Sequence, residues 1–244
     1  MRMTSRRGST DRMRLKNEGA PIKAVIFDLD DTLISEYQFI VSGYRYMAEY
    51  MTGRTGRTPK ETEDKLWELS KTSYANVFNR LFDEWGIPYS DADIKELVAV
   101  YRNHPARLTF YPDVLPALQG IKDKGIPMGI ISDGDPGRQR NKLKTVDGDR
   151  WFDHVILTDE FGGARYRKPD PRGFVTMTEL MGVDASQMIY VGDNPAKDFH
   201  IAQDMPVRTA RITRENGIYN DREYLDGIRE TWSIDSLVDI IQLL

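Results

Sequence analysis

Residues 24–33 read Ala-Val-Ile-Phe-Asp-Leu-Asp-Asp-Thr-Leu, an apolar run that ends in three carboxylates within four positions. The segment 23–27 is typical of a short buried strand, and Asp28, Asp30 and Asp31 follow it directly. Like charges crowded at a strand end repel one another and are costly to remove from water, so a fold keeps them most readily beside a cation. Hard cations such as Mg²⁺ prefer carboxylate oxygens. This stretch therefore predicts a metal-assisted active site at the tip of a buried strand.

Length and composition are those of an ordinary globular protein, and they exclude several classes of function. With 244 residues, of which 40% are hydrophobic and 30% charged, the chain can bury a large core in one or two domains. A net charge of −4 argues against general nucleic-acid binding. No apolar run reaches the roughly 18 residues of a membrane span, so we expect no membrane partner. The absence of cysteine excludes a thiolate metal site or nucleophile and agrees with the cytoplasmic location that we expect.

The first 23 residues differ in charge from the rest of the chain. They carry seven Lys or Arg side chains against two acidic ones, a net charge of +5 where the whole chain carries −4. Segments with high net charge and few apolar residues cannot bury enough surface to fold alone. We therefore expect residues 1–20 to be a basic, flexible extension rather than a phosphate-binding arm.

Residues 34–108 carry the pattern of about four helices. Thr58 and Glu61 form a capping box around Pro59, which marks a helix start. We expect His104, near the end of the last helix, to be exposed. Aromatic and Met side chains recur through this segment at helical spacing, and the simplest explanation is the core of a helix bundle. They are Tyr44, Met47, Trp67, Tyr74, Phe78, Phe82 and Trp85.

After Pro112 the pattern changes to helices that alternate with short apolar strands. This alternation predicts a parallel sheet covered by helices on both faces. We expect an α/β core from residues 21–33 and 109–244, with residues 34–108 inserted as a helical cap. The expected strands of the second core segment are 128–132, 154–158, 188–192 and 207–212, and its expected helices are 114–124, 138–145, 171–181, 196–203 and 235–243.

Several of these strands end in a polar group. Asp28 follows the first strand, Ser132 ends the second, and Asp193 follows the strand 188–192. Lys168 lies in a loop just before a helix. In parallel α/β sheets, ligands bind outside the carboxyl ends of the strands, so these distant residues can converge on one site.

These segments resemble the four motifs of the haloacid dehalogenase (HAD) superfamily. Asp-Leu-Asp-Asp-Thr at 28–32, Ser132, Lys168 and Gly-Asp-Asn-Pro-Ala-Lys-Asp at 192–198 occur in the family's order. The match covers about residues 22–212. The helical insert directly after the first motif resembles the type C1 cap of subfamily I. The resemblance implies the HAD fold, a Rossmann-like parallel sheet core with an inserted all-helical cap domain.

The resemblance also implies a role for each motif residue. Asp28 would be the nucleophile and form an aspartyl-phosphate, and Asp30 would protonate the leaving group and then deprotonate water. Because like charges crowd this loop, we expect Asp30 to be a neutral carboxyl. Ser132 would hydrogen-bond a phosphoryl oxygen, and Lys168 would neutralise transition-state charge. Thr32 would orient the first motif at the phosphate.

The metal implied by the resemblance is Mg²⁺. Its ligands would be Asp28, the backbone carbonyl of Asp30, and Asp193, with Asp198 helping directly or through water. Asp31 would be a bystander, a solvated or hinge-loop carboxylate. We expect the arginines outside the motifs, Arg165, Arg167, Arg208, Arg211 and Arg214, to be scattered surface charge.

The second carboxylate of the first motif decides between reactions within this family. Dehalogenases lack an acid at that position, so Asp30 favours phosphoryl transfer. The related sugar mutases carry a cap histidine about a dozen residues after the nucleophile, where this chain has Ile40, so we favour hydrolysis. The expected substrate is a small phosphorylated metabolite, with sugar phosphates first and nucleotides or phosphoglycolate behind. A phosphomutase and a non-catalytic regulatory or assembly module remain as alternatives, and the protein would be a monomer or homodimer.

Overall fold

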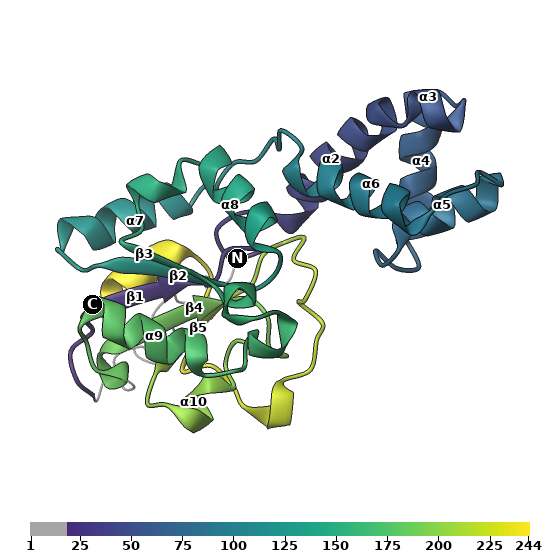
Figure 1. Cartoon of the computed structure of the whole chain (residues 1–244). Coiled ribbons are helices and arrows are strands. Elements are labelled where there is room, and N and C mark those ends of the chain that lie inside the picture. The colour runs from purple at the N-terminus through teal and green to yellow at the C-terminus, as the bar shows by residue number, and fades with distance from the viewer. Residues whose placement is uncertain (1–18) are drawn as a thin grey trace, which may run out of the picture.

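The computed structural model describes residues 19–244, so the predicted extension 1–20 lies almost entirely outside the described residues. Six parallel strands form one sheet in the order β3-β2-β1-β4-β5-β6 (Figure 1). This order places β1, which carries the first motif, between β2 and β4. The predicted parallel α/β architecture is confirmed. The strands are β1 (Ala24–Phe27), β2 (Met128–Ser132), β3 (His154–Leu157), β4 (Met188–Gly192), β5 (Arg208–Ile212) and β6 (Trp232–Ile234).

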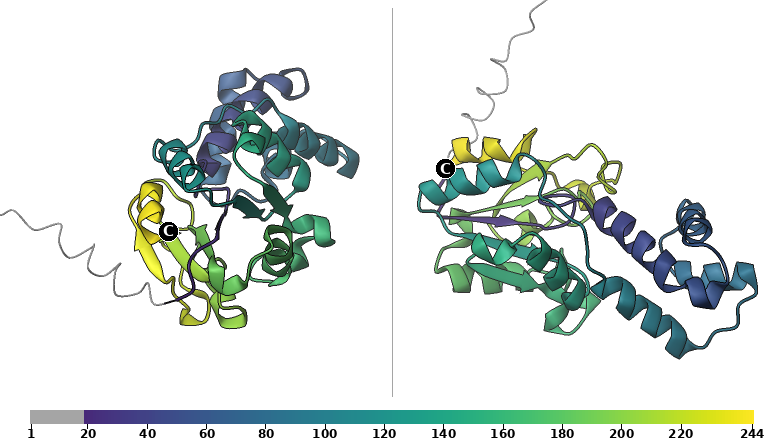
Figure 2. Two further views of the ribbon diagram at one scale, coloured as in Figure 1. Left: turned by 90° about the vertical axis from the view of Figure 1, so that its left-hand side faces the viewer. Right: turned by 90° about the horizontal axis from the view of Figure 1, so that it is seen from above.

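Helices cover both faces of the sheet, as Figures 1 and 2 show. On one face the 3₁₀ helix η6 packs beside α7 over the inward side chains of β1, β4 and β5. On the other face α9 and α10 cover Ile26 and Tyr190. Burial on both faces explains why β1, β2 and β4 are fully buried along their length. The α-helices of this part are α7 (Val114–Asp123), α8 (Pro136–Thr145), α9 (Arg172–Met181) and α10 (Ile201–Asp204), and its last 3₁₀ helix is η6 (Leu237–Leu243).

The inserted segment forms a bundle beyond the carboxyl ends of the strands, which point toward it (Figures 1 and 2). Its hydrophobic cluster is separate from those of the sheet and includes Tyr44, Met47, Phe78 and Phe82. The predicted capping box at Thr58 is present. No helix within residues 19–244 is long and apolar enough to cross a membrane. The helices of the bundle are α2 (Glu36–Tyr50), α3 (Thr52–Thr55), α4 (Pro59–Ser70), α5 (Val77–Trp85) and α6 (Asp91–Asn103).

Two predictions for single residues of the bundle were wrong. Tyr74 precedes α5 and is 47% exposed, so it does not belong to the bundle core. His104 is only 1% exposed, because its ring packs against Phe39 and Tyr101 and its Nε2 lies 2.8 Å from Oγ of Ser42.

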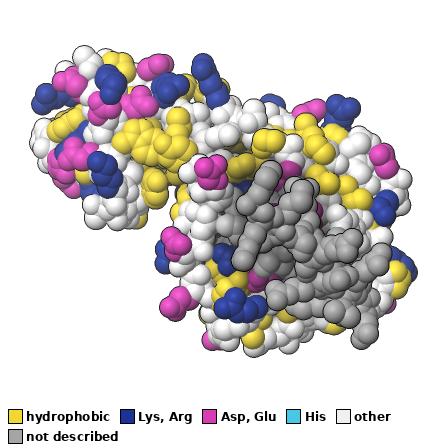
Figure 3. Space-filling view, turned by 180° about the vertical axis from the view of Figure 1, so that it is seen from behind, with side chains coloured by type: hydrophobic (Ala, Val, Ile, Leu, Met, Phe, Trp, Pro, Cys, Tyr) yellow, Lys and Arg dark blue, Asp and Glu magenta, His cyan; other side chains and the backbone are white. Residues whose placement is uncertain are grey.

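The outer surface of the bundle is not uniformly polar. Seen from behind, it carries a patch of hydrophobic side chains close to its junction with the core (Figure 3). A hollow of about 370 Å³ lies between α2 and residues 105–107, and Tyr37, Val41 and Tyr46 are among the residues that line it. Neither Asp28 nor Asp30 lines this hollow.

The connection between sheet and bundle is braced by Arg214, which was predicted to be surface charge and is instead buried. Its Nε and Nη2 donate to the carbonyl of Thr32 at 3.1 and 2.6 Å, and its Nη1 lies 2.9 Å from both carboxylate oxygens of Asp113. Ile34 forms an isolated bridge with Phe110, so the two chain segments that enter and leave the bundle lie side by side. Arg214 thus ties the loop after β1, which enters the bundle, to the segment that returns from it.

The carboxyl-terminal part of the core differs from its predicted pattern. The helix expected over 196–203 is reduced to α10, and the last helix is 3₁₀ rather than α. Sequence analysis missed β6, whose three residues are too few to show a clear period.

Candidate active site

Asp28 lies at the end of β1, and its backbone N–H donates to the carbonyl of Val191 at 2.8 Å. The residue is 3% exposed, and Oδ1 accepts from Nζ of Lys168 at 2.7 Å. Burial raises the pKa of Asp28 to about 6, although Lys168 and Lys197 act in the opposite direction. Asp28 is therefore a carboxylate at neutral pH, but one that is poorly solvated and held by a cation.

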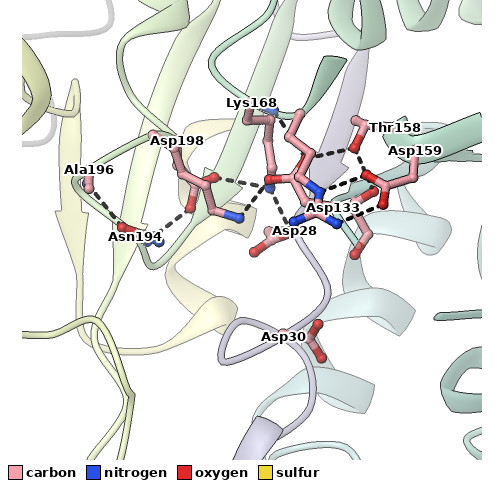
Figure 4. Close-up of polar contacts among 12 residues, drawn as sticks. Asp28, Asp30, Asp133, Thr158, Asp159, Lys168, Asn194, Ala196 and Asp198 are labelled. Atoms are coloured by element: carbon pink, nitrogen blue, oxygen red, sulfur yellow. Dashed lines mark hydrogen bonds and ion pairs between the residues drawn. The ribbon is translucent and has the colours of Figure 1, made fainter. Parts of the chain in front are cut away.

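Lys168 connects three oxygen atoms deep in the site. Besides Asp28, its Nζ donates to the hydroxyl of Tyr190 at 2.6 Å. Nζ also lies 3.0 Å from Oδ1 of Asp198 (Figure 4). Burial opposes the charge of Lys168, but Asp198 and Asp28 outweigh it, so its pKa lies well above the usual range. The ammonium is therefore charged and fixed in position.

Three carboxylates could hold a metal ion. Oxygen atoms of Asp28, Asp193 and Asp198 all lie within 4.8 Å of one another. Both carboxylate oxygens of Asp193 are buried and have no hydrogen-bond partner within residues 19–244. Burial, and then Asp198 and Asp28, raise the pKa of Asp193 well above its usual value. A buried carboxylate without donors fits a cation, and the all-oxygen set matches the preference of Mg²⁺.

Gly192 makes the close approach of Asp198 possible. A Cβ at position 192 would lie 2.5 Å from Oδ2 of Asp198, closer than any real contact. The same oxygen accepts from the backbone N–H of Asn194 at 2.9 Å. The loop after β4 is therefore folded back so that Asp193 and Asp198 face the same point.

Asp30 lies apart from this cluster (Figure 4). Its carboxylate accepts from Nζ of Lys142 at 2.6 Å and from Nε2 of Gln139 at 2.8 Å, both on α8. Burial alone would raise the pKa of Asp30, but Lys142 and Arg138 outweigh it, so the pKa lies well below its usual range. The expectation of a neutral carboxyl was thus wrong for this conformation, because a buried lysine compensates the crowding.

Lys142 also joins Asp30 to the first residue of the bundle. Its fully buried Nζ contacts Glu36, which begins α2. Sequence analysis missed Gln139 and Lys142, although their spacing of three places them on one face of a predicted helix. Asp30 and the start of α2 are therefore held by the same side chain.

The remaining residues of the first and second motifs have different surroundings. Ser132 is 1% exposed, and its Oγ accepts from Gln139 at 2.7 Å. Thr32 is buried, does not line the pocket at Asp28, and its hydroxyl has no partner within residues 19–244. Asp31 has a φ of 52° and accepts from the backbone N–H groups of Glu36 and Ile218. Asp31 therefore holds the turn, as expected of a hinge-loop carboxylate, although it is buried and not solvated.

The site opens into a pocket of about 270 Å³ beneath the start of α2. Of the predicted residues, Asp28, Asp30, Ser132 and Lys168 line it. Glu36 and five further charged or aromatic residues that sequence analysis did not assign to the site also line it. The five are Asp133, Arg138, Arg167, Lys197 and Tyr219.

Fold and site together define a protein with a parallel α/β core that carries a buried acidic cluster and a buried lysine at the carboxyl ends of its strands. Residues 25–212 match the family model described as haloacid dehalogenase-like hydrolase. The chain belongs to this family. The predicted family is thereby confirmed.

Several curated relatives match nearly the whole chain. The glyceraldehyde 3-phosphate phosphatase of Methanocaldococcus jannaschii is 29% identical and covers 91% of this chain and 97% of that protein. The enzyme of the same name from Pyrococcus abyssi is 31% identical, covering 77% of this chain and 80% of its own. Pyrophosphatase PpaX of Bacillus cereus is 23% identical, with 91% and 96% coverage. The predicted class of enzyme, a phosphatase, agrees with these names.

Solved structures of low sequence identity share the fold. A HAD phosphatase from Thermococcus onnurineus is 24% identical, covers 91% of this chain and 97% of its own, and has a TM-score of 0.60. An L-2-haloacid dehalogenase from Xanthobacter autotrophicus is 22% identical, covers 91% and 98%, and has a TM-score of 0.59. These likenesses confirm the fold.

Proposed function

We propose that the protein is a Mg²⁺-dependent phosphatase that hydrolyses a small phosphate monoester through a phosphorylated Asp28. The observation that carries this proposal is the arrangement of Asp28, held by Lys168 on one side and adjoining the unpartnered oxygens of Asp193 on the other. Such an arrangement gives an anionic nucleophile, a fixed cation and a place for a metal at one strand end.

In the first step, an oxygen of the Asp28 carboxylate attacks phosphorus. Lys168 binds Oδ1, which leaves the other oxygen for the attack. The P–O bond to the alcohol breaks, the phosphoryl group becomes bonded to Asp28, and the leaving oxygen takes a proton from Asp30. Lys168 keeps the carboxylate ionised in spite of its burial.

In the second step, Asp30 takes a proton from water, and the water oxygen attacks phosphorus to release inorganic phosphate and free Asp28. The structure holds Asp30 as a carboxylate between Lys142 and Gln139, which is the form needed for this base step. Before the first step, Asp30 must take up a proton and weaken its contact with Lys142.

Asp28, Asp193, Asp198 and the carbonyl of Asp30 are the groups that we assign to Mg²⁺. When bound, the ion would supply positive charge that lets an anionic carboxylate approach an anionic phosphate. The donor set supports this assignment because every proposed ligand atom is an oxygen. The oxygens of Asp193 would gain the partner that they lack within the described part of the chain.

The substrate that we favour is a sugar phosphate of small size. A pocket of about 270 Å³ with charged walls suits a short polar molecule. Relatives named for glyceraldehyde 3-phosphate, a three-carbon sugar phosphate, support this choice. The phosphomutase alternative is disfavoured because Ile40 is 5% exposed and packs inside the bundle, and its apolar side chain cannot serve as an acid or base.

Turnover of phosphorylated compounds tests the proposal. The purified protein should hydrolyse an aryl phosphate and members of a panel of sugar phosphates, including glyceraldehyde 3-phosphate, and chelation of Mg²⁺ should stop it. Asp28→Asn should lower kcat by at least about 10³-fold while the melting curve stays cooperative. Absence of turnover across the panel with Mg²⁺ present would favour the non-catalytic module, and preferred release of phosphate from pyrophosphate would contradict the monoester assignment.

A further inference from the structure

Gln139 is a polar side chain that is completely buried beside the active site. It lies in the first turn of α8, which follows the loop after Ser132. Its Nε2 donates to Oδ2 of Asp30 at 2.8 Å and to Oγ of Ser132 at 2.7 Å. Burial of an amide is costly unless the amide is hydrogen-bonded. One buried side chain thus joins the acid and base of the proposed mechanism to the hydroxyl predicted to bind phosphate.

The orientation of this amide follows from its neighbours. Both oxygens of the Asp30 carboxylate accept hydrogen bonds, Oδ1 from Lys142 at 2.6 Å and Oδ2 from Gln139. An amide turned the other way would place its own oxygen against an acceptor. In the observed orientation, Oε1 of Gln139 is buried and has no partner within residues 19–244. The side chain therefore keeps both contacts of Nε2 and leaves its oxygen unpaired.

This orientation determines what the hydroxyl of Ser132 can do. Oγ accepts from Gln139, so the hydroxyl proton is not used in that contact. Ser132 lines the pocket together with Asp28. The hydroxyl is therefore kept as a donor for an oxygen of a phosphoryl group in the pocket.

The same amide limits the movement of Asp30. In the proposed mechanism, Asp30 weakens its contact with Lys142 before it protonates the leaving group. Lys142 binds Oδ1, whereas Gln139 binds Oδ2, so the first contact can be lost while the second is kept. The proton is then carried on Oδ1, and the carboxyl group stays in place.

From these contacts we infer that Gln139 is a positioning residue that sets both the hydroxyl of Ser132 and the carboxyl of Asp30 for the reaction. This inference rests on the proposed phosphatase function and adds a residue to its machinery. Gln139 does not itself line the pocket. It acts on phosphate binding through Ser132 and on proton transfer through Asp30, and the two effects can be measured separately.

The effect through Asp30 is measured by comparing two esters with saturating Mg²⁺. One is the sugar phosphate that the wild type turns over best, whose leaving group needs a proton, and the other is an aryl phosphate, whose leaving group needs little. Gln139→Met keeps the length of the side chain and removes its donors. It should lower kcat/KM for the sugar phosphate about tenfold more than for the aryl phosphate. A role in packing alone would lower both values by the same factor.

The effect through Ser132 is measured by calorimetric titration of inorganic phosphate into the full-length protein with Mg²⁺. Ser132→Ala should weaken phosphate binding by about tenfold and Gln139→Met by about threefold. Because Gln139 acts on phosphate only through Ser132, the double variant should bind phosphate as weakly as Ser132→Ala alone.

Asn141→Leu is the matched control. This amide lies on the same helix, but it donates to the backbone carbonyls of Arg102 and His104 and not to a residue of the site. Its loss should lower the Tm and leave the ratio of the two kcat/KM values as in the wild type. If Gln139→Met does not fold, Gln139→Leu takes its place in both measurements.

Two results would overturn the inference. They are an unchanged ratio of the two kcat/KM values in the Gln139 variant, and losses of phosphate affinity that add up in the double variant. A wild-type protein that hydrolyses neither ester would contradict the proposed function instead. The phosphate titrations would then still decide whether Gln139 acts through Ser132.

Discussion

Asp193 shows at the scale of one residue how the fold prepares a site for a cation. Its carboxylate is 1% exposed, and within the described residues neither oxygen has a hydrogen-bond donor. Leaving a charge in this state costs free energy, and the raised pKa of Asp193 expresses that cost. The folded protein therefore gives up stability at this position in the absence of metal.

Substitution of Asp193 tests whether its carboxylate destabilises the metal-free protein. Because the pKa is raised, the charged form of Asp193 disfavours folding at neutral pH, so Asp193→Asn should raise the Tm of the chelator-treated protein. The same change should weaken Mg²⁺ activation by at least about 10-fold. It should also remove most of the Tm increase that Mg²⁺ causes. Melting curves with and without Mg²⁺ measure both effects, and a lower metal-free Tm in the variant would contradict them.

His104 provides a test of pH dependence away from the metal cluster. Burial lowers the pKa of His104, although its contact with the carbonyl of Tyr101 acts in the opposite direction. The unfolded chain therefore binds the proton more readily, and this contribution to stability is lost as pH falls below about 6.5. We expect the Tm of the wild type to fall more steeply than the Tm of His104→Gln as the pH is lowered from about 7.5 to about 5.5. Parallel curves would show that His104 does not carry this dependence.

At the scale of elements, the loop between β1 and α2 depends on a residue that follows a different strand of the sheet, β5. Arg214 follows β5, yet it binds the carbonyl of Thr32 and the carboxylate of Asp113. Asp113 in turn accepts from the backbone N–H of Leu237 at 2.8 Å. The first motif, the return from the bundle and the last helix therefore share one buried ion pair.

Removal of Arg214 should affect both stability and chemistry. Arg214→Met leaves the half-buried Asp113 with fewer donors, so the free energy of unfolding should fall by about 2 kcal/mol. Because the loop that carries Asp30 loses its brace, kcat should fall as well. Arg208→Met is the control, since Arg208 lies at the opposite end of β5 and binds the carbonyl of Ser186. Equal kcat values in the two variants would contradict a role for Arg214 in holding the site.

At the scale of the whole molecule, sequence alone predicted five of the six strands and several of the residues that meet at their carboxyl ends. Periodicity sufficed for the strands because they are buried on both faces, and parallel strands bring their carboxyl ends together. It did not suffice for Gln139, Lys142 and Arg214, whose roles depend on partners 109 to 182 positions away. The ionisation state of Asp30 could not be predicted from the sequence either, because Asp30 is a carboxylate only through the position of Lys142.

Trapping of the phosphorylated enzyme tests the central claim most directly. An aryl phosphate has a good leaving group that needs little protonation, so Asp30→Asn should still undergo the first step while the second, which needs a base, becomes slow. Asp30→Asn protein is mixed with Mg²⁺ and an aryl phosphate labelled in its phosphoryl group, and the reaction is then quenched with acid. The label should be found on the peptide that contains Asp28. The double variant with Asp28→Asn should carry none. Label on another residue, or turnover with no labelled protein in Asp30→Asn, would contradict the account.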